Sequence, residues 1–244
     1  MPSEPVVKIC RSLTTGVVVI WMAVAVFAIP ALSLDYPQSL EQELKTLLDA
    51  SAQTSSDPST LMKLAGLYLD MGNDLFTEKA KRLATYEEGV RMAGRALDLK
   101  EDSAEAHFLY AANMGEMADL KGVGESLMKI DEIKSHVARA LQLQKDHVPS
   151  LHMGGMLLEA LPRFMGGNPD AALRYIQRAV TADPTYTQAR LDLAKMYLKR
   201  DNPELARSEL LAIVRMDHPR DPYAWAKQHR PEAARLLQEL EHPK

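Results

Sequence analysis

The pattern of hydrophobic and polar positions after residue 38 is that of amphipathic helices. The segment "SLEQELKTLLDA" has leucines three and four residues apart, which places four of them on one side of a helix: Leu40, Leu44, Leu47 and Leu48. The segment "PEAARLLQELE" has the same pattern at Ala233, Leu236, Leu237 and Leu240. Residues that favour helices dominate after residue 34, whereas Val, Ile and Thr are sparse. The chain is therefore predicted to be all-α.

Two stretches that lie 34 residues apart begin in nearly the same way. Residues 168–180 read "NPDAALRYIQRAV" and residues 202–214 read "NPELARSELLAIV". In both, Asn is suited to cap a helix, Pro fits the first helical position, and the acid that follows favours the positive end of the helix dipole. Thirty-four residues is the period of the tetratricopeptide repeat (TPR), in which helical hairpins stack into a solenoid.

Small residues extend this repeat toward the N-terminus. Four residues occupy the position that Ala179 has in "QRAV", and we call them anchors: Ala96, Ala140, Ala179 and Ile213. Four more residues lie where neighbouring helices must approach closely, and all four are small: Ala65, Ala111, Gly155 and Ala194. We predict a right-handed α-solenoid of four TPR-like hairpins, at about 58–101, 102–146, 147–184 and 185–218. Because a solenoid needs capped ends, capping helices are expected in 34–57 and 219–244.

The variation in repeat length falls between the two helices of a hairpin. From small residue to anchor the spacings are 31, 29, 24 and 19 residues, so the first three hairpin tips carry about 12, 10 and 5 extra residues. The first two extensions are expected to lengthen the helices, whereas Pro162 and the pair Gly166–Gly167, which can take positive φ, predict a break. Insertions in repeat proteins collect on one face, often the binding face. The third tip is thus a candidate partner-binding loop, made of Leu161, Pro162, Arg163, Phe164, Met165, Gly166 and Gly167.

The first helix of each unit is expected to face a groove. The usual TPR positions give an expected set of groove residues: Met62, Leu69, Asp70, Glu105, Phe108, Glu116, His152, Met156, Glu159, Gln188, Leu191, Lys195 and Lys199. This groove would run from acidic and apolar to basic, which suits a peptide or helix of a protein partner. The many methionines in these helices either fill gaps in the core or form a soft apolar surface.

Composition and motifs do not indicate catalysis. The net charge is −4, so no basic footprint points to nucleic acid. The sequence has no GxxxxGK[ST], HExxH, GxSxG or CxxC motif, and its single cysteine is Cys10. His147 and His152 are five residues apart, which does not place them on one helical face. We therefore expect no catalytic, cofactor-binding or metal-binding residues and a protein that is not an enzyme.

The N-terminus has the pattern of an export signal. Lys8 and Arg11 precede the uncharged run "TTGVVVIWMAVAVFAIPALS", and Ala31 and Ser33 have the spacing that signal peptidase recognises. Cleavage after Ser33 would give a soluble periplasmic protein. The alternative is an uncleaved anchor at residues 13–33 that holds the chain on the inner membrane, facing the periplasm.

The repeat segment resembles the TRAP-transporter T-component (TatT-like) family of TPR proteins. The resemblance covers roughly residues 60–240, with an aromatic position at Phe108, and rests on Ala106, Ala111, Gly115, Lys121, Gly122, Leu161, Pro162, Gly166 and Gly167. It implies an exported helical protein that partners the solute-binding subunit of a tripartite ATP-independent periplasmic transporter. A general adaptor for envelope assembly or secretion remains the alternative, and self-association is left open.

Overall fold

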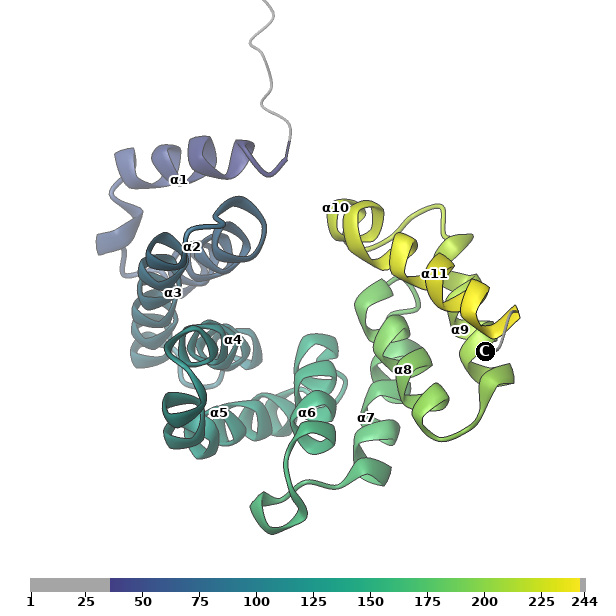
Figure 1. Cartoon of the computed structure of the whole chain (residues 1–244). Coiled ribbons are helices and arrows are strands. Elements are labelled where there is room, and N and C mark those ends of the chain that lie inside the picture. Colours follow the sequence, from purple (N-terminus) through teal and green to yellow (C-terminus); the bar gives the residue numbers. More distant parts are fainter. Residues whose placement is uncertain (1–35, 242–244) are drawn as a thin grey trace, which may run out of the picture. The chain divides into compact units, whose positions relative to one another are not determined.

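The computed structural model describes residues 36–241, and these residues fold as helices joined by short turns, with no strand among them. Four consecutive helical hairpins make up most of the compact unit Leu34–Lys244 (Figure 1). Their helices are α2 (Pro58–Asp70) and α3 (Lys79–Leu99), α4 (Ala104–Lys121) and α5 (Val123–Leu143), α6 (Val148–Ala160) and α7 (Pro169–Ala182), and α8 (Thr187–Lys199) and α9 (Pro203–Val214). The predicted all-α repeat fold is confirmed.

Helices also cover both ends of the repeats. On one side are α1 (Ser39–Asp49) and a 3₁₀ turn, η1 (Ala52–Thr54), and Leu40 of α1 packs with Leu67 and Met71. On the other side are α10 (Pro222–Ala224), a π-helical turn, η4 (Trp225–His229), and α11 (Arg230–Glu241). Ala233 and Leu236 of α11 are buried in the core shared with α9. Both predicted hydrophobic stripes therefore face the repeats.

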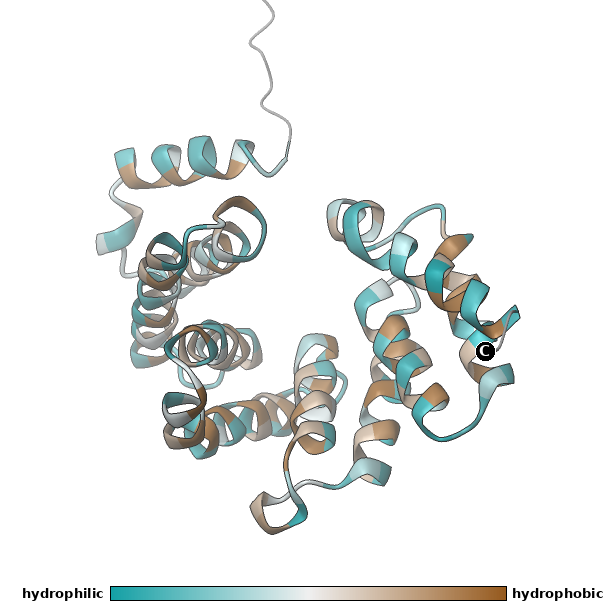
Figure 2. Cartoon of the chain, viewed as in Figure 1, coloured by the Kyte–Doolittle hydropathy of each residue, from teal (hydrophilic) through white to brown (hydrophobic). Residues whose placement is uncertain are grey.

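The small residues do lie where helices approach one another. Ala65, Ala111 and Ala194 are fully buried, as are the anchors at 96, 140, 179 and 213. A Cβ atom on Gly155 would lie 2.5 Å from Cδ1 of Ile176 on the partner helix, which is closer than packing allows. Hydrophobic residues follow the helix sides that face neighbouring helices (Figure 2). The repeated small residues thus mark real close contacts between helices.

Helix starts agree with the sequence except at one position. The side chain of Asn168 caps α7 by accepting a 3.0 Å hydrogen bond from the backbone N–H of Ala171. Asn202 occupies the predicted N-cap position of α9, but its side chain makes no capping hydrogen bond. The turn before α9 is tighter, because Asp201 has φ of 54° and the N–H of Asn202 turns back to the carbonyl of Tyr197.

The three extended tips have different structures. The first is a π-helical turn, η2 (Met71–Leu75), and the second reduces to Gly122, with φ of 109°, between two long helices. The third is a 3₁₀ turn, η3 (Arg163–Met165), followed by Gly166 at φ of 95°. Gly167 does not take the predicted positive φ. It must be glycine because a Cβ there would lie 1.7 Å from the carbonyl oxygen of Leu161.

The predicted export signal, with Cys10, lies outside the described residues. Within residues 36–241, no helix has both the length and the apolar character that a membrane crossing requires.

Candidate functional site

A cleft of about 650 Å³ is lined by the first helices of all four hairpins. We call it the central cleft. Helices α2, α4, α6 and α8 each contribute side chains to it, and the first tip, the start of α3 and the C-terminal segment from 221 to 229 complete its walls. A surface made by one helix from every unit is the surface that a TPR array offers to a ligand, so this cleft is the candidate site.

The apolar part of the cleft comes from the middle units. Phe108 of α4 and Met153 and Met156 of α6 are half-buried and border the cleft, together with Leu69 at the end of α2. Methionine side chains are flexible and polarisable, so they adapt to ligands of varied shape. This region can accept an apolar side chain of a ligand without a change in the fold.

Carboxylates that are far apart in sequence gather at one end of the cleft. Although the side chain of Asp70 is exposed to solvent, partial desolvation by the cleft wall raises its pKa to about 7, and the neighbouring charges of Asp74, Asp221 and Glu43 act in the same direction. Burial also raises the pKa of Asp74, against the hydrogen bond that Tyr36 Oη donates to its carboxylate. No cation among residues 36–241 pairs with Asp70. This end therefore holds negative charge that the described chain does not neutralise.

The nearest guanidinium is already occupied. Arg82 Nε donates to the carbonyl of Gly72 at 2.9 Å, and its Nη2 donates to Tyr86 Oη at 3.0 Å. Its Nη2 lies 3.8 Å from a carboxylate oxygen of Glu116, whose pKa is raised by burial despite that charge. Arg82 thus orders the cleft wall and only partly offsets its negative charge.

Where α6 and α8 line the cleft, their polar side chains form a closed hydrogen-bond network. Asp192 is 8% exposed and bonds at 2.8 Å with both His152 Nε2 and Gln188 Nε2. The other ring nitrogen of His152 lies 3.1 Å from Tyr186 Oη. These groups satisfy one another, so this wall is rigid and polar.

Some of the expected groove residues do line this cleft. The ones it contains are Leu69, Asp70, Phe108, Glu116, His152, Met156 and Gln188. Met62 instead packs against the first core, with its sulfur 3.2 Å from Ser103 Oγ, and Glu105 binds His147 at 2.9 Å. Leu191 is 4% exposed and belongs to the core, because the C-terminal segment packs on α8. Its assignment to an open groove is wrong.

The residues of the expected basic end do not line this cleft. Lys199 Nζ and Arg200 Nη2 both bind Glu159, at 2.7 and 3.1 Å, and Lys195 lies 3.5 Å from Glu232. Glu159, Lys195 and Lys199 therefore belong to ion pairs outside the cleft. The charged side chains that line the cleft itself are mostly acidic.

Several cleft residues were not anticipated. Among them are Asn73, Asp74, Arg82, Asp192, Asp221 and His229. Most of them lie in the irregular π turns, the second helix of the first hairpin and the C-terminal segment, which have no fixed place in the repeat. The two acids four residues apart in "YLDMGNDL", Asp70 and Asp74, were the one available signal for the first two.

The third tip lies apart from the cleft. Phe164 is 89% exposed, and Lys134 Nζ of α5 donates to the carbonyl of Met165 at 3.2 Å. Val123 and Met128 at the second tip are 77% and 73% exposed. The second and third tips thus present apolar side chains to solvent, whereas the first forms cleft wall.

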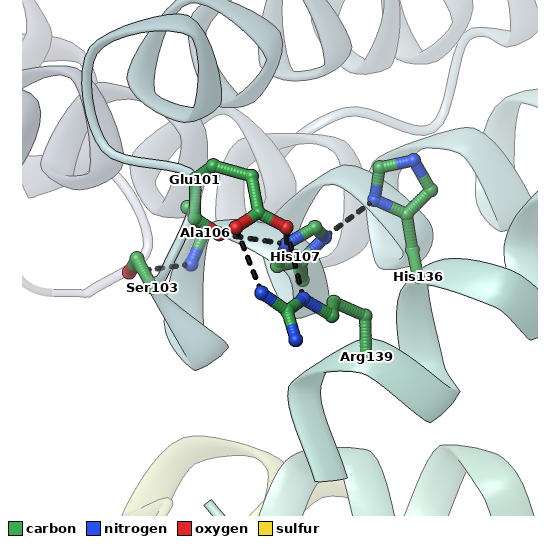
Figure 3. Close-up of polar contacts among 6 residues, drawn as sticks. All are labelled: Glu101, Ser103, Ala106, His107, His136 and Arg139. Carbon is green, nitrogen blue, oxygen red and sulfur yellow. Dashed lines mark hydrogen bonds and ion pairs between the residues drawn. The ribbon is translucent and has the colours of Figure 1, made fainter. Parts of the chain in front are cut away.

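A second polar cluster joins α4 to α5 outside the cleft (Figure 3). His107 Nδ1 lies 2.9 Å from His136 Nδ1, and Arg139 binds both carboxylate oxygens of Glu101 at 2.9 and 2.8 Å. Since two ring nitrogens can share only one proton, burial and the facing His107 lower the pKa of His136. Each member has a partner within the chain, so the cluster serves to hold the second hairpin together.

Asp70→Asn is expected to raise the free energy of unfolding by about 1 kcal/mol at pH 8, after allowance for solvent screening. The folded-state pKa of about 7 lies above the ordinary value of 3.8, so folding takes up a proton and stability falls as pH rises between these values. The gain should disappear near pH 4. Urea denaturation at both pH values measures it, with the exposed Asp98→Asn as control; an equal gain at both pH values would contradict the assignment.

Two family models match the sequence. The one described as "Regulator of microtubule dynamics protein 1-3" matches residues 31–158, and a tetratricopeptide repeat model matches residues 164–230. The first match covers more than half of the chain. The chain belongs to this family.

Relatives in the regulator of microtubule dynamics family are about 30% identical to this chain over the aligned residues. Regulator of microtubule dynamics protein 1 of Mus musculus is 29% identical over 168 residues, which cover 62% of this chain and 55% of the relative. The Pongo abelii protein of that name is 29% identical over 217 residues, covering 82% and 68%. The chain thus spans little more than half the length of the mouse relative.

A solved structure supports the repeat fold. A thermophilic TPR protein of Thermus thermophilus has a TM-score of 0.61 at 13% identity, covering 82% of this chain and 92% of that one. The TPR part of the resemblance seen in the sequence is confirmed. None of the comparisons supports its transporter part.

Proposed function

We propose that this chain is a non-catalytic scaffold that binds a segment of a partner protein in the central cleft. The observation that carries the proposal is that all four hairpins direct their first helix into one cleft of about 650 Å³. Its lining combines a soft apolar floor with acidic groups, while its imidazoles are engaged by carboxylate and hydroxyl partners. This arrangement supports recognition of a ligand rather than catalysis.

Two finer parts of the proposal rest on the sequence. Export to the periplasm, or anchoring by residues 13–33, is supported by the N-terminal signal pattern alone. An accessory role at a TRAP-type transporter is supported only by the resemblance of the repeat segment. A general adaptor role in the cell envelope fits the same cleft equally well.

Photo-cross-linking tests the proposal. A photoreactive residue in place of Met156, in the cleft, is expected to capture one or a few proteins in the native cells, and the purified partner should cross-link again. The same residue in place of Leu205, 45% exposed on α9, is the control. Identical products from both positions, or none from the cleft, would refute the cleft as the binding site.

The third tip forms a second arm of this experiment. Replacing "LPRFMGGNP" by "LKRDNP", the short turn of the fourth unit, should leave helicity and melting nearly unchanged and abolish partner binding if the exposed tips share in recognition. Unfolding of this variant would make the loop structural. Normal folding and binding would confine recognition to the cleft.

Family membership favours a second candidate function. The names of the relatives concern the regulation of microtubule dynamics, and we propose a contribution to such regulation as the alternative role of this chain. Co-sedimentation of the purified chain with polymerised tubulin tests it directly.

A further inference from the structure

The central cleft has an excess of negative charge that its own residues do not balance. Five carboxylates line it, on Asp70, Asp74, Glu116, Asp192 and Asp221, against the single guanidinium of Arg82 and two histidines. Arg82 is held by the Gly72 carbonyl and Tyr86 Oη, and lies 3.8 Å from Glu116. The imbalance is therefore a property of the folded cleft and not only of the composition.

The unbalanced charge is concentrated at one end. Asp192 is satisfied by His152 and Gln188, whereas Asp70 and Asp74 lie close enough to Asp221 for the three charges to repel one another. These carboxylates come from α2, η2 and the residue before α10, which are brought together only by the fold. Repulsion between neighbouring like charges costs stability, and a cation placed among them relieves it.

The apolar part of the cleft limits the kind of cation. Phe108 and Met156 border the same cleft as these carboxylates. A free metal ion or small amine would leave these side chains unused. A polypeptide with a basic residue and an apolar residue a short distance apart satisfies both surfaces.

We propose that the central cleft binds a lysine- or arginine-containing segment of the partner protein, with its cationic side chain among Asp70, Asp74 and Asp221 and an apolar side chain against Phe108 and Met156. This inference rests on the proposed function and names the chemistry of the partner. Charge complementarity of this kind contributes mainly to specificity and to the rate of association.

A peptide of defined composition tests the proposal on the full chain. The probe is a fluorescein-labelled dodecapeptide with four lysines, two leucines and serine and glycine elsewhere. The controls are the same peptide with glutamate for lysine and the same peptide with serine for leucine. Fluorescence anisotropy should show that the lysine–leucine peptide binds, that the glutamate peptide does not, and that rising salt weakens binding.

Protein variants separate the cleft from general attraction to an acidic protein. The double variant Asp70→Asn with Asp74→Asn should weaken peptide binding at least about ten-fold, because both substitutions remove negative charge from the site. Asp49→Asn with Asp98→Asn makes the same change in net charge on exposed residues outside the cleft and should leave binding unchanged. Phe108→Ser should weaken binding of the lysine–leucine peptide and leave binding of the control peptide with serine for leucine unchanged.

Each other outcome overturns the proposal. Equal binding to the two double variants, or equal binding of the glutamate peptide, would show that the cleft carboxylates do not select a cation. If spermine bound as tightly as the peptide, and Phe108→Ser did not change its affinity, the site would be assigned to a free polyamine. If a partner cross-links at position 156 but the peptide does not bind, the scaffold function stands and only the basic character of the partner is rejected. If the peptide binds but no partner cross-links at position 156, the scaffold function is rejected.

Discussion

Gly89→Ala is expected to lower the free energy of unfolding by about 3 kcal/mol, although alanine is a better helix former than glycine. The added Cβ would lie 2.0 Å from Oδ1 of Asn113, which is fully buried on α4. Asn113 Nδ2 donates to the carbonyls of Ala65 and Leu109, at 3.2 and 2.9 Å, so displacing the amide breaks two buried hydrogen bonds. Thermal and urea denaturation measure the loss.

A matched variant on the same helix isolates the cause. A Cβ on Gly94 would meet only ordinary contacts, 3.6 Å from the ring of Tyr110, so Gly94→Ala should stabilise by up to about 1 kcal/mol. Combining Gly89→Ala with Asn113→Ala should recover about 2 kcal/mol relative to the sum of the single variants, because the new methyl group fills the space of the lost amide. Similar melting of the two glycine variants would disprove the close packing.

Tyr86→Ala is expected to destabilise the chain by about 4 kcal/mol, the usual cost of removing a fully buried aromatic ring. The ring is fully buried and lies over Gly72, where a Cβ would be 2.3 Å from ring carbon Cε1. Its hydroxyl donates to Asn73 Oδ1 at 2.7 Å and accepts from Arg82 at 3.0 Å. Since Asn73 and Arg82 line the central cleft, the loss should also release the first tip.

Tyr86→Phe separates these two effects. It keeps the ring and removes only the hydroxyl, so it should cost about 1 to 2 kcal/mol. Amide hydrogen exchange should rise at residues 71–76 and stay unchanged in α8. If Tyr86→Phe destabilised the chain as much as Tyr86→Ala, the packing of the ring would not be the main contribution.

The sequence predicts the repeated features of this fold well, because they follow a fixed spacing. The small residues at 65, 111, 155 and 194 occupy the same place in successive hairpins, and each lies at a close helix contact. Pro162 and Gly166 likewise predict the break at the third tip, because proline disfavours the helix interior and glycine accepts positive φ. In both cases the signal lies within one repeat.

The cleft is predicted less well, because it depends on segments outside the repeat. Asp221 begins the C-terminal segment. No repeat spacing predicts that this segment packs on α8, and the same packing buries Leu191. The π turn after Asp70 adds Asn73 and Asp74 to the cleft in a way that ideal helix positions cannot anticipate. Lys195 and Lys199 were assigned by position alone, and their carboxylate partners lie on other helices.

The order in which the helices pack has a consequence for how the chain folds. The main interfaces join helices that are neighbours in sequence, from α2 with α3 through to α8 with α9. Contacts between residues close in sequence form with little loss of chain entropy, so such topologies fold quickly. Each hairpin can collapse as soon as it is synthesised and then serve as the template for the next. The cleft, which needs both ends of the array, should be the last feature to form and the first to be lost.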